Sequence, residues 1–126
     1  MSDLFGNLDS ISGMLSRVPF GLITDVDGTI SEIAPSPAEA RVHPECKAQL
    51  SRLVGRLPLV AAISGRPVVE AKEMVGVDGM VYVGNHGLER WRNGVIEYVE
   101  GAEGYREKLA AARQELTACF RSKAFI

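Results

Sequence analysis

Short apolar runs alternate with segments of helical periodicity through the middle of this chain. The short runs are residues 21–24, 59–63 and 80–83, and their apolar character predicts buried parallel strands. Residues 44–56 and 68–75 carry apolar positions at near-helical spacing, which predicts a crossover helix between successive strands. The pattern therefore indicates an α/β fold with a parallel sheet.

The pattern changes beyond the third predicted strand. Residues 88–92 and 95–99 flank Asn93-Gly94, which is the dipeptide most typical of a two-residue hairpin turn. Trp91 is expected to pack in this hairpin, with stacking on a bound ligand as the alternative. Residues 104–120 are rich in Ala, Glu, Lys and Leu and predict a helix.

The N-terminal end of the chain predicts a separate element. Apolar residues recur there at helical spacing, which predicts a short amphipathic helix packed on the domain: Leu4, Leu8, Ile11 and Leu15. We divide the chain into an N-terminal helix or leader, residues 1–19, and a core, residues 20–126. The leader lacks a basic region followed by an apolar core, so no secretory signal is expected.

Composition narrows the class of protein. A length of 126 residues suits one domain, and a net charge of −2 gives no electrostatic footprint for nucleic acid. No apolar run is long enough to span a membrane. Cys46 and Cys119 show no metal-ligand spacing and imply no disulfide framework, so a reducing cytoplasm is the simplest location.

Two carboxylates directly follow the first predicted strand. Asp25 and Asp27 lie one residue apart on a glycine-bearing turn, where the change of direction after Val26 lets both converge on one pocket. Crowded like charges raise the pKa of one member, and a bound cation relieves the repulsion. Asp25 is suited to attack phosphorus and form an aspartyl-phosphate, with Asp27 as general acid and base. The alternative is an ordinary Asp-Gly turn after a strand.

Residues 25–29, Asp-Val-Asp-Gly-Thr after an apolar strand, resemble the first motif of the haloacid dehalogenase superfamily of phosphohydrolases. The resemblance implies that Asp25 is the nucleophile and Asp27 the acid/base. It also implies a Mg²⁺ cofactor held by Asp25 and Asp27, the latter through its backbone carbonyl. Thr29 matches the hydroxyl that fixes the nucleophile.

A second motif follows the second predicted strand. Ser64-Gly65-Arg66-Pro67 combines a hydroxyl with backbone amides that lead toward a helix N-terminus, which is an arrangement suited to phosphate. The alternative is a serine N-cap with proline in the first helical turn, and both interpretations can hold at once. Residues 34–38, Ala-Pro-Ser-Pro-Ala, form a stiff loop that either shapes the entrance to the site or is a plain connector.

A third motif narrows the family. Residues 84–89, Gly-Asn-His-Gly-Leu-Glu, follow the third predicted strand and would face the same crevice as the first two motifs. Together with residues 30–35 and 64–67, they resemble the trehalose-6-phosphate phosphatases. This resemblance implies that Arg66, Asn85 and His86 help hold the sugar phosphate. The expected set of phosphate- and substrate-binding residues is completed by Thr29, Ser64, Gly65 and Glu89.

Two of these assignments have simpler alternatives. His86 taken alone is more typical of a hydrogen-bonded loop histidine than of a ligand for a sugar phosphate. Glu89 either orients a sugar hydroxyl or is a solvated strand residue.

The resemblance also sets expectations for the fold. It implies the N-terminal half of a three-layer α/β/α Rossmann-like core with an extra β-hairpin and without a cap domain. The later lysine and acidic motifs of the superfamily do not occur in this sequence, so we expect only the N-terminal part of an enzyme, with weak or no turnover alone. The first strand would then be an exposed edge, open to a complementary C-terminal half or to self-association.

The expected function is Mg²⁺-dependent dephosphorylation of trehalose 6-phosphate to trehalose, by way of an aspartyl-phosphate, in trehalose biosynthesis. A small-molecule sugar phosphate is the expected partner. Two alternatives remain open at this point. One is a phosphatase of the same superfamily for another sugar phosphate, and the other is a non-catalytic fragment that binds sugar phosphate.

Overall fold

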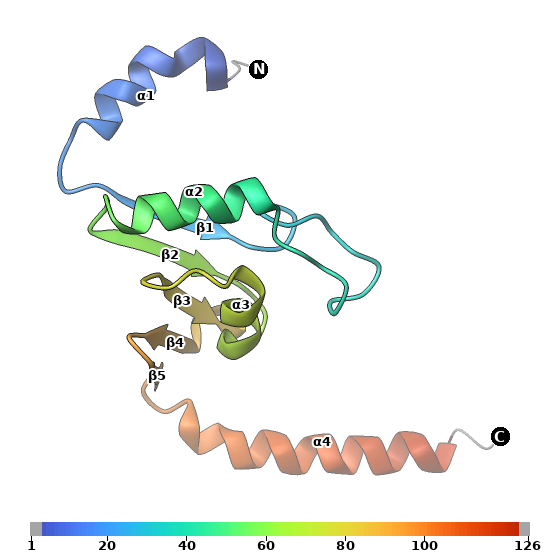
Figure 1. Cartoon of the computed structure of the whole chain (residues 1–126). Helices are drawn as coiled ribbons and strands as arrows, with labels where there is room; N and C mark the ends of the chain where they lie inside the picture. Colours follow the sequence, from blue (N-terminus) through green and yellow to red (C-terminus); the bar gives the residue numbers. More distant parts are fainter. Residues whose placement is uncertain (1–3, 124–126) are drawn as a thin grey trace.

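One mixed sheet organises the chain, and the computed structural model describes residues 4–123 of it (Figure 1). Three parallel strands come first, followed by an antiparallel hairpin, in the spatial order β1-β2-β3-β4-β5. The strands are β1 Gly21–Asp25, β2 Leu59–Ile63, β3 Val81–Gly84, β4 Glu89–Arg92 and β5 Val95–Tyr98. The predicted strands are confirmed, with bounds that differ by one residue from the predicted ones in β1, β3, β4 and β5.

Two crossover helices lie on the same face of the sheet (Figure 1). They are α2 Pro44–Val54 and α3 Val68–Val75. Right-handed β–α–β connections that step in one direction across a sheet place their helices on one side, which explains the arrangement. The ends follow local chemistry, since His43 Nδ1 accepts a hydrogen bond from the Glu45 amide at the start of α2 and left-handed Gly76 ends α3.

The core fills the space between these helices and the sheet. Tyr82 is fully buried at its centre, and its hydroxyl donates to the Val77 carbonyl at 2.6 Å. Burial raises the pKa of the Tyr82 phenol above its ordinary value. The ring of Trp91 meets Tyr82 edge-on at 5.8 Å, so the prediction that Trp91 packs in the hairpin is confirmed.

The opposite face of the sheet carries no helix among residues 4–123. Ile23, Leu59 and Ile63 lie on this face and are 58%, 40% and 41% exposed. The described residues therefore supply the sheet and one helical layer of the three-layer arrangement expected from the resemblance. The outer edge of β1 is also unpaired within this range, since β1 bonds only to β2. Within residues 4–123, β1 is therefore an edge strand of this sheet.

The two terminal segments form helices that extend from the sheet (Figure 1). Leu4–Asn7 is a 3-10 turn followed by α1 Leu8–Leu15, and α4 spans Glu103–Lys123. Helix α1 forms as predicted, but the prediction that it packs on the domain is wrong because none of its residues is buried. An apolar stripe predicts that a helix has an apolar side, but it does not say whether a surface lies opposite.

Three further expectations concern membrane-spanning helices, the hairpin turn and the division of the chain. No helix within residues 4–123 combines the length and the apolar character needed to cross a membrane. The hairpin turn is confirmed, with Asn93 and Gly94 both at positive φ as its geometry requires. The division into residues 1–19 and 20–126 stays a prediction.

Candidate active site

The turn that follows β1 is held by one buried carbonyl. The Val26 carbonyl oxygen accepts hydrogen bonds from the amides of Ile30 and Ser31, both at 3.1 Å, and from the Ser31 hydroxyl at 3.1 Å. Val26 is fully buried, so it anchors the turn in the core while its two acidic neighbours stay outside. This anchoring fixes the backbone on which both carboxylates stand.

Asp25 lies at the tip of β1 and is held by a neighbouring hydroxyl. Thr29 Oγ1 donates to Asp25 Oδ2 at 3.2 Å across the turn. Gly28 lies between them at a φ of +82°, which is a left-handed conformation that glycine adopts without strain. The expectation that the Thr29 hydroxyl fixes this carboxylate is confirmed by the contact.

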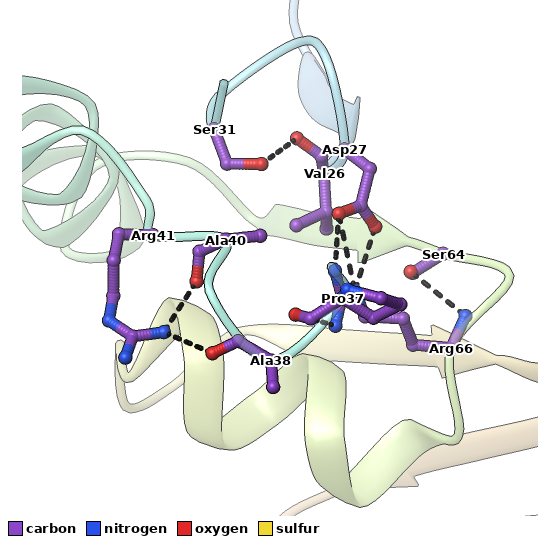
Figure 2. A network of polar contacts seen from close by, with 9 residues as sticks. All are labelled: Val26, Asp27, Ser31, Pro37, Ala38, Ala40, Arg41, Ser64 and Arg66. Carbon is purple, nitrogen blue, oxygen red and sulfur yellow. Dashed lines mark hydrogen bonds and ion pairs between the residues drawn. The ribbon is translucent and has the colours of Figure 1, made fainter. Parts of the chain in front are cut away.

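Asp27 is held by a guanidinium from the next strand's loop (Figure 2). Arg66 Nη2 donates to Asp27 Oδ1 at 2.7 Å, and Arg66 Nε donates to Oδ2 at 2.9 Å. These hydrogen bonds hold the pKa of Asp27 below its ordinary value, a shift that partial burial opposes and the charge of Arg66 reinforces. Arg66, expected from the resemblance to hold the sugar phosphate, is thus engaged with the neighbouring carboxylate.

Ser64 follows β2 and is almost completely buried. Its hydroxyl accepts a hydrogen bond from the Arg66 amide at 3.1 Å, which closes the loop on itself. Ser64 is not the N-cap of α3, because Pro67 occupies that position and the helix begins at Val68. The interpretation of Ser64 as a helix cap is therefore wrong.

Glu89 takes the capping position instead. Its Oε2 accepts from the Val68 amide at 2.9 Å, so a carboxylate from β4 satisfies an amide in the first turn of α3. The side chain is half-buried rather than solvated, which excludes the second of its two interpretations. Its role toward a sugar hydroxyl stays a prediction.

The loop after β3 docks on the loop after β2. The Asn85 amide donates to the Arg66 carbonyl at 2.7 Å, and the His86 amide donates to the Ser64 carbonyl at 3.3 Å. Both Asn85 and His86 have positive φ values. A Cβ on Gly65 would lie 2.7 Å from His86 Cε1, so the imidazole lies directly against a glycine that leaves room for it. His86 is therefore a hydrogen-bonded loop residue, and the same hydrogen bond holds it close to Ser64.

The contact with Gly65 gives a testable prediction for His86. We expect Gly65→Ala to displace the imidazole, since the added methyl would overlap the ring, while the core stays folded because a flexible side chain gives way. A changed set of His86 ring resonances by NMR, with the thermal midpoint within about 3 °C of the parent, is the expected result. Unchanged ring resonances would contradict this contact.

A cavity of about 460 Å³ opens beside Asp27. Its walls are the loop over residues 33–40 and the first turn of α3, so the stiff loop lines a cavity beside Asp27. Its role as the entrance to an active site stays a prediction. The lining residues are Asp27, Ile33, Ala34, Ser36, Pro37, Ala40, Gly65, Arg66, Pro67 and Glu70. Glu70 was not predicted, because one acid in a helix of mixed polarity gives no signal in the sequence.

The predicted site residues gather at one edge of the sheet. Parallel strands β1, β2 and β3 end there, and each is followed directly by one of the three motifs. Glu89 joins them because it pairs with Gly84 in the antiparallel register of β3 and β4. The carboxyl ends of parallel strands are where ligands bind in open α/β sheets.

The donor set at this edge fits part of a magnesium site. Asp25 and Asp27 offer the hard oxygen ligands that Mg²⁺ prefers, and Mg²⁺ is commonly bound by one or two carboxylates with substrate phosphate. No group of three His, Cys, Asp or Glu side chains within the described residues is arranged to hold a metal ion. Of the two carboxylates, Asp27 is engaged by Arg66, while Asp25 accepts from Thr29.

The fold and the edge of the sheet define a class before any particular family. A Rossmann-like β–α–β sheet with Asp-x-Asp at the end of β1 and Ser-Gly-Arg after β2 is the α/β arrangement expected from the resemblance to the haloacid dehalogenase superfamily. The sequence profile of the family described as Trehalose-phosphatase matches residues 23–116. The chain belongs to that family.

Individual relatives support the same family. The trehalose-phosphate phosphatase of Mycobacterium avium (strain 104) is 41% identical over 86 residues, which cover 68% of this chain and 21% of the relative. That of Mycobacterium leprae (strain TN) is 34% identical over 89 residues, covering 71% of this chain and 20% of the relative. The chain thus spans about a fifth of the length of the curated relatives it matches.

A solved structure supports the fold. The crystal structure of a trehalose-6-phosphate phosphatase related protein superposes with a TM-score of 0.70 at 20% sequence identity. The match covers 82% of this chain and 44% of that chain. It confirms the α/β fold expected from the sequence.

Proposed function

We propose that this chain forms the front of the active site of a phosphatase that converts trehalose 6-phosphate to trehalose. The observation that carries the proposal is the position of Asp25 at the tip of β1, fixed by Thr29 and next to Asp27. Family membership supports trehalose 6-phosphate as the substrate and trehalose biosynthesis as the process.

Each carboxylate has one role in the proposed reaction. An Asp25 oxygen attacks phosphorus, the bond from phosphorus to the sugar oxygen breaks, and Asp27 gives that oxygen a proton. Water then attacks the aspartyl-phosphate, the bond between phosphorus and Asp25 breaks, and Asp27 takes the proton from the water. The contact with Arg66 favours ionised Asp27, which suits the second step, so this contact must loosen for the first.

The remaining predicted residues are proposed to bind the substrate. The Ser64 loop would hold the phosphoryl group, while Asn85 and His86 lie close enough to that loop to reach the same group. Mg²⁺, held by Asp25 and Asp27, would neutralise charge on the phosphoryl oxygens. A phosphatase for another sugar phosphate would use the same residues.

A non-catalytic sugar-phosphate-binding fragment is the second candidate. The observation that favours it is the incomplete set of metal ligands among the described residues. Phosphoryl transfer depends mainly on positioning and charge stabilisation, so we expect this chain alone to show weak or no turnover.

Phosphate release tests both candidates. The chain is assayed with Mg²⁺, alone and mixed with the C-terminal remainder of the Mycobacterium avium relative, on trehalose 6-phosphate, sucrose 6-phosphate and glucose 6-phosphate. We expect release only from the mixture and fastest with trehalose 6-phosphate. Faster release from another sugar phosphate would show that trehalose 6-phosphate is not the preferred substrate. A folded mixture that binds the sugar phosphate without releasing phosphate would favour the second candidate.

The exposed edge of β1 leads to a prediction about association. We propose that the unpaired edge and the bare apolar face around Ile23 let the chain alone self-associate, and that a complementary C-terminal half competes for the same edge. Ile23→Lys is expected to lower the mass measured by light scattering at equal concentration. Val69→Lys, at an exposed apolar position on α3, is the control and should leave the mass unchanged.

Two coarser proposals complete this assignment. We place the protein in the cytoplasm, since its two cysteines imply no disulfide framework. We also retain residues 1–19 as a leader ahead of the hydrolase core in residues 20–126, in keeping with the family match over residues 23–116.

A further inference from the structure

Arg66 links three parts of the candidate site (Figure 2). Its Nε and Nη2 donate to Asp27, its Nη1 donates to the Pro37 carbonyl at 2.8 Å, and its backbone amide donates to Ser64 Oγ. The Arg66 side chain is only 15% exposed, compared with 39% for Asp27. One guanidinium therefore joins the turn after β1 to a loop ten residues further along the chain.

The loop that carries Pro37 is held by arginines rather than by regular structure. Arg41 Nη1 donates to the carbonyls of Ala38 and Ala40 at 2.8 and 2.9 Å, which folds the end of the loop on itself. The Glu39 amide donates to Ser36 within the loop. Of the side-chain contacts drawn in Figure 2, the hydrogen bond from Arg66 to the Pro37 carbonyl is the one that joins this loop to the acidic turn.

We propose that Arg66 is a positioning residue that couples the orientation of the Asp27 carboxylate to the placement of the loop over residues 34–40. That loop forms one wall of the 460 Å³ cavity onto which Asp27 faces. Loss of the guanidinium would remove both the contact that orients the carboxylate and the contact that ties this wall to the acidic turn. The effect of this coupling on proton transfer from Asp27 to the leaving sugar oxygen rests on the proposed function. The coupling itself does not.

The geometry requires the fork of an arginine. Two nitrogens meet the two Asp27 oxygens while a third reaches the Pro37 carbonyl, and these three directions are fixed in one plane. A lysine ammonium is a single point that keeps the charge but cannot meet both partners in this way. Arg66→Lys therefore removes the link without removing the positive charge.

A second arginine in the chain provides a matched control. Arg90 donates from Nε and Nη2 to Glu97 Oε2 across the hairpin, with about half of each side chain exposed. No loop is attached to this pair. Arg90→Lys thus makes the same chemical change in another arginine–carboxylate pair. Neither Arg90 nor Glu97 lines the cavity beside Asp27.

The coupling is tested by amide hydrogen exchange in the chain itself, without substrate. Arg66→Lys and Asp27→Ala should each raise exchange at residues 36–41 by about tenfold or more, the size expected for losing charge-assisted hydrogen bonds. Asp27→Ala is the sharper test because, within residues 4–123, the side-chain hydrogen bonds of Asp27 all go to Arg66 and none goes to the loop itself. In the double variant the two effects should not add, since both remove one link. Arg90→Lys should leave residues 36–41 unchanged.

A spectroscopic measurement separates positioning from simple stability. Arg66→Lys should shift the ¹³Cγ resonance of Asp27 at neutral pH, while amides in β2 keep their protection because the core stays folded. Unchanged loop exchange in Asp27→Ala would overturn the coupling. An unchanged Asp27 resonance in Arg66→Lys would overturn the positioning role. Because no turnover is measured, either result is independent of whether the protein is a phosphatase.

Discussion

Asp25→Asn is expected to reduce phosphate release by the complemented enzyme by a factor on the order of 10⁴–10⁶, as for loss of a nucleophile in other enzymes. The amide is a poor nucleophile and carries no charge for Mg²⁺. In the proposed mechanism, the hydrogen bond from Thr29 orients this carboxylate for attack. Release is measured with this chain and the C-terminal remainder of the Mycobacterium avium relative.

Two further variants give this loss its meaning. Asp27→Asn should cost less, roughly 10²–10⁴, because it removes proton transfer but leaves the nucleophile. Asp78→Asn changes an exposed aspartate outside the candidate site and should leave the rate unchanged. Asp25→Asn activity within about tenfold of the parent would show that another group attacks phosphorus.

Gly84→Ala is expected to destabilise the chain by about 3 kcal/mol, at the upper end of what overpacking costs. A Cβ at this position would lie 2.3 Å from the Val68 amide nitrogen and 2.8 Å from the Arg66 carbonyl oxygen. Both atoms are backbone at the entry to α3, so no rotamer change relieves the overlap. The end of β3 and the first turn of α3 must therefore separate, which also disturbs the loop after β2.

Urea unfolding measures this loss through its midpoint and slope. Gly104→Ala is the control, because a Cβ there meets nothing within 4 Å and the position lies in α4. Alanine should stabilise that helix by about 0.5–1 kcal/mol. A Gly84→Ala midpoint equal to the parent's would contradict the close approach of β3 and α3.

The gathering of the three motifs at one edge of the sheet could be predicted from the sequence for a topological reason. Each motif follows a short apolar strand, and parallel strands end at one edge, so Asp25, Ser64 and Asn85 meet without any knowledge of side-chain geometry. The contact of Thr29 with Asp25 could also be predicted from the sequence, because the two residues are four positions apart across a turn.

The partners of the long charged side chains could not be predicted from the sequence. Arg66 and Asp27 are 39 residues apart, and Glu89 and Val68 are 21 apart, so only the assembled fold brings each pair together. Arg66 was therefore assigned to the substrate alone, and the capping of α3 by Glu89 was missed. Long charged side chains reach several partners from one position, and tertiary packing selects among them.

The coverage of apolar surfaces was also only partly predictable. The stripe in Leu8–Leu15 correctly predicts a helix, but the structure leaves it without a buried residue. In contrast, α3 was predicted with its observed bounds because its apolar residues lie opposite a sheet whose position follows from the crossover. Periodicity gives the face of an element, while its partner depends on the connections around it.

The most direct test of the account is to find where phosphate is attached during turnover. The complemented enzyme is mixed with radiolabelled trehalose 6-phosphate and Mg²⁺, quenched in acid, digested, and mapped for labelled peptides. The account predicts label on the peptide that contains Asp25 and none in the Asp25→Asn variant. Label on a peptide without Asp25, or turnover with no labelled peptide at any quench time, would contradict attack by Asp25 at the end of β1.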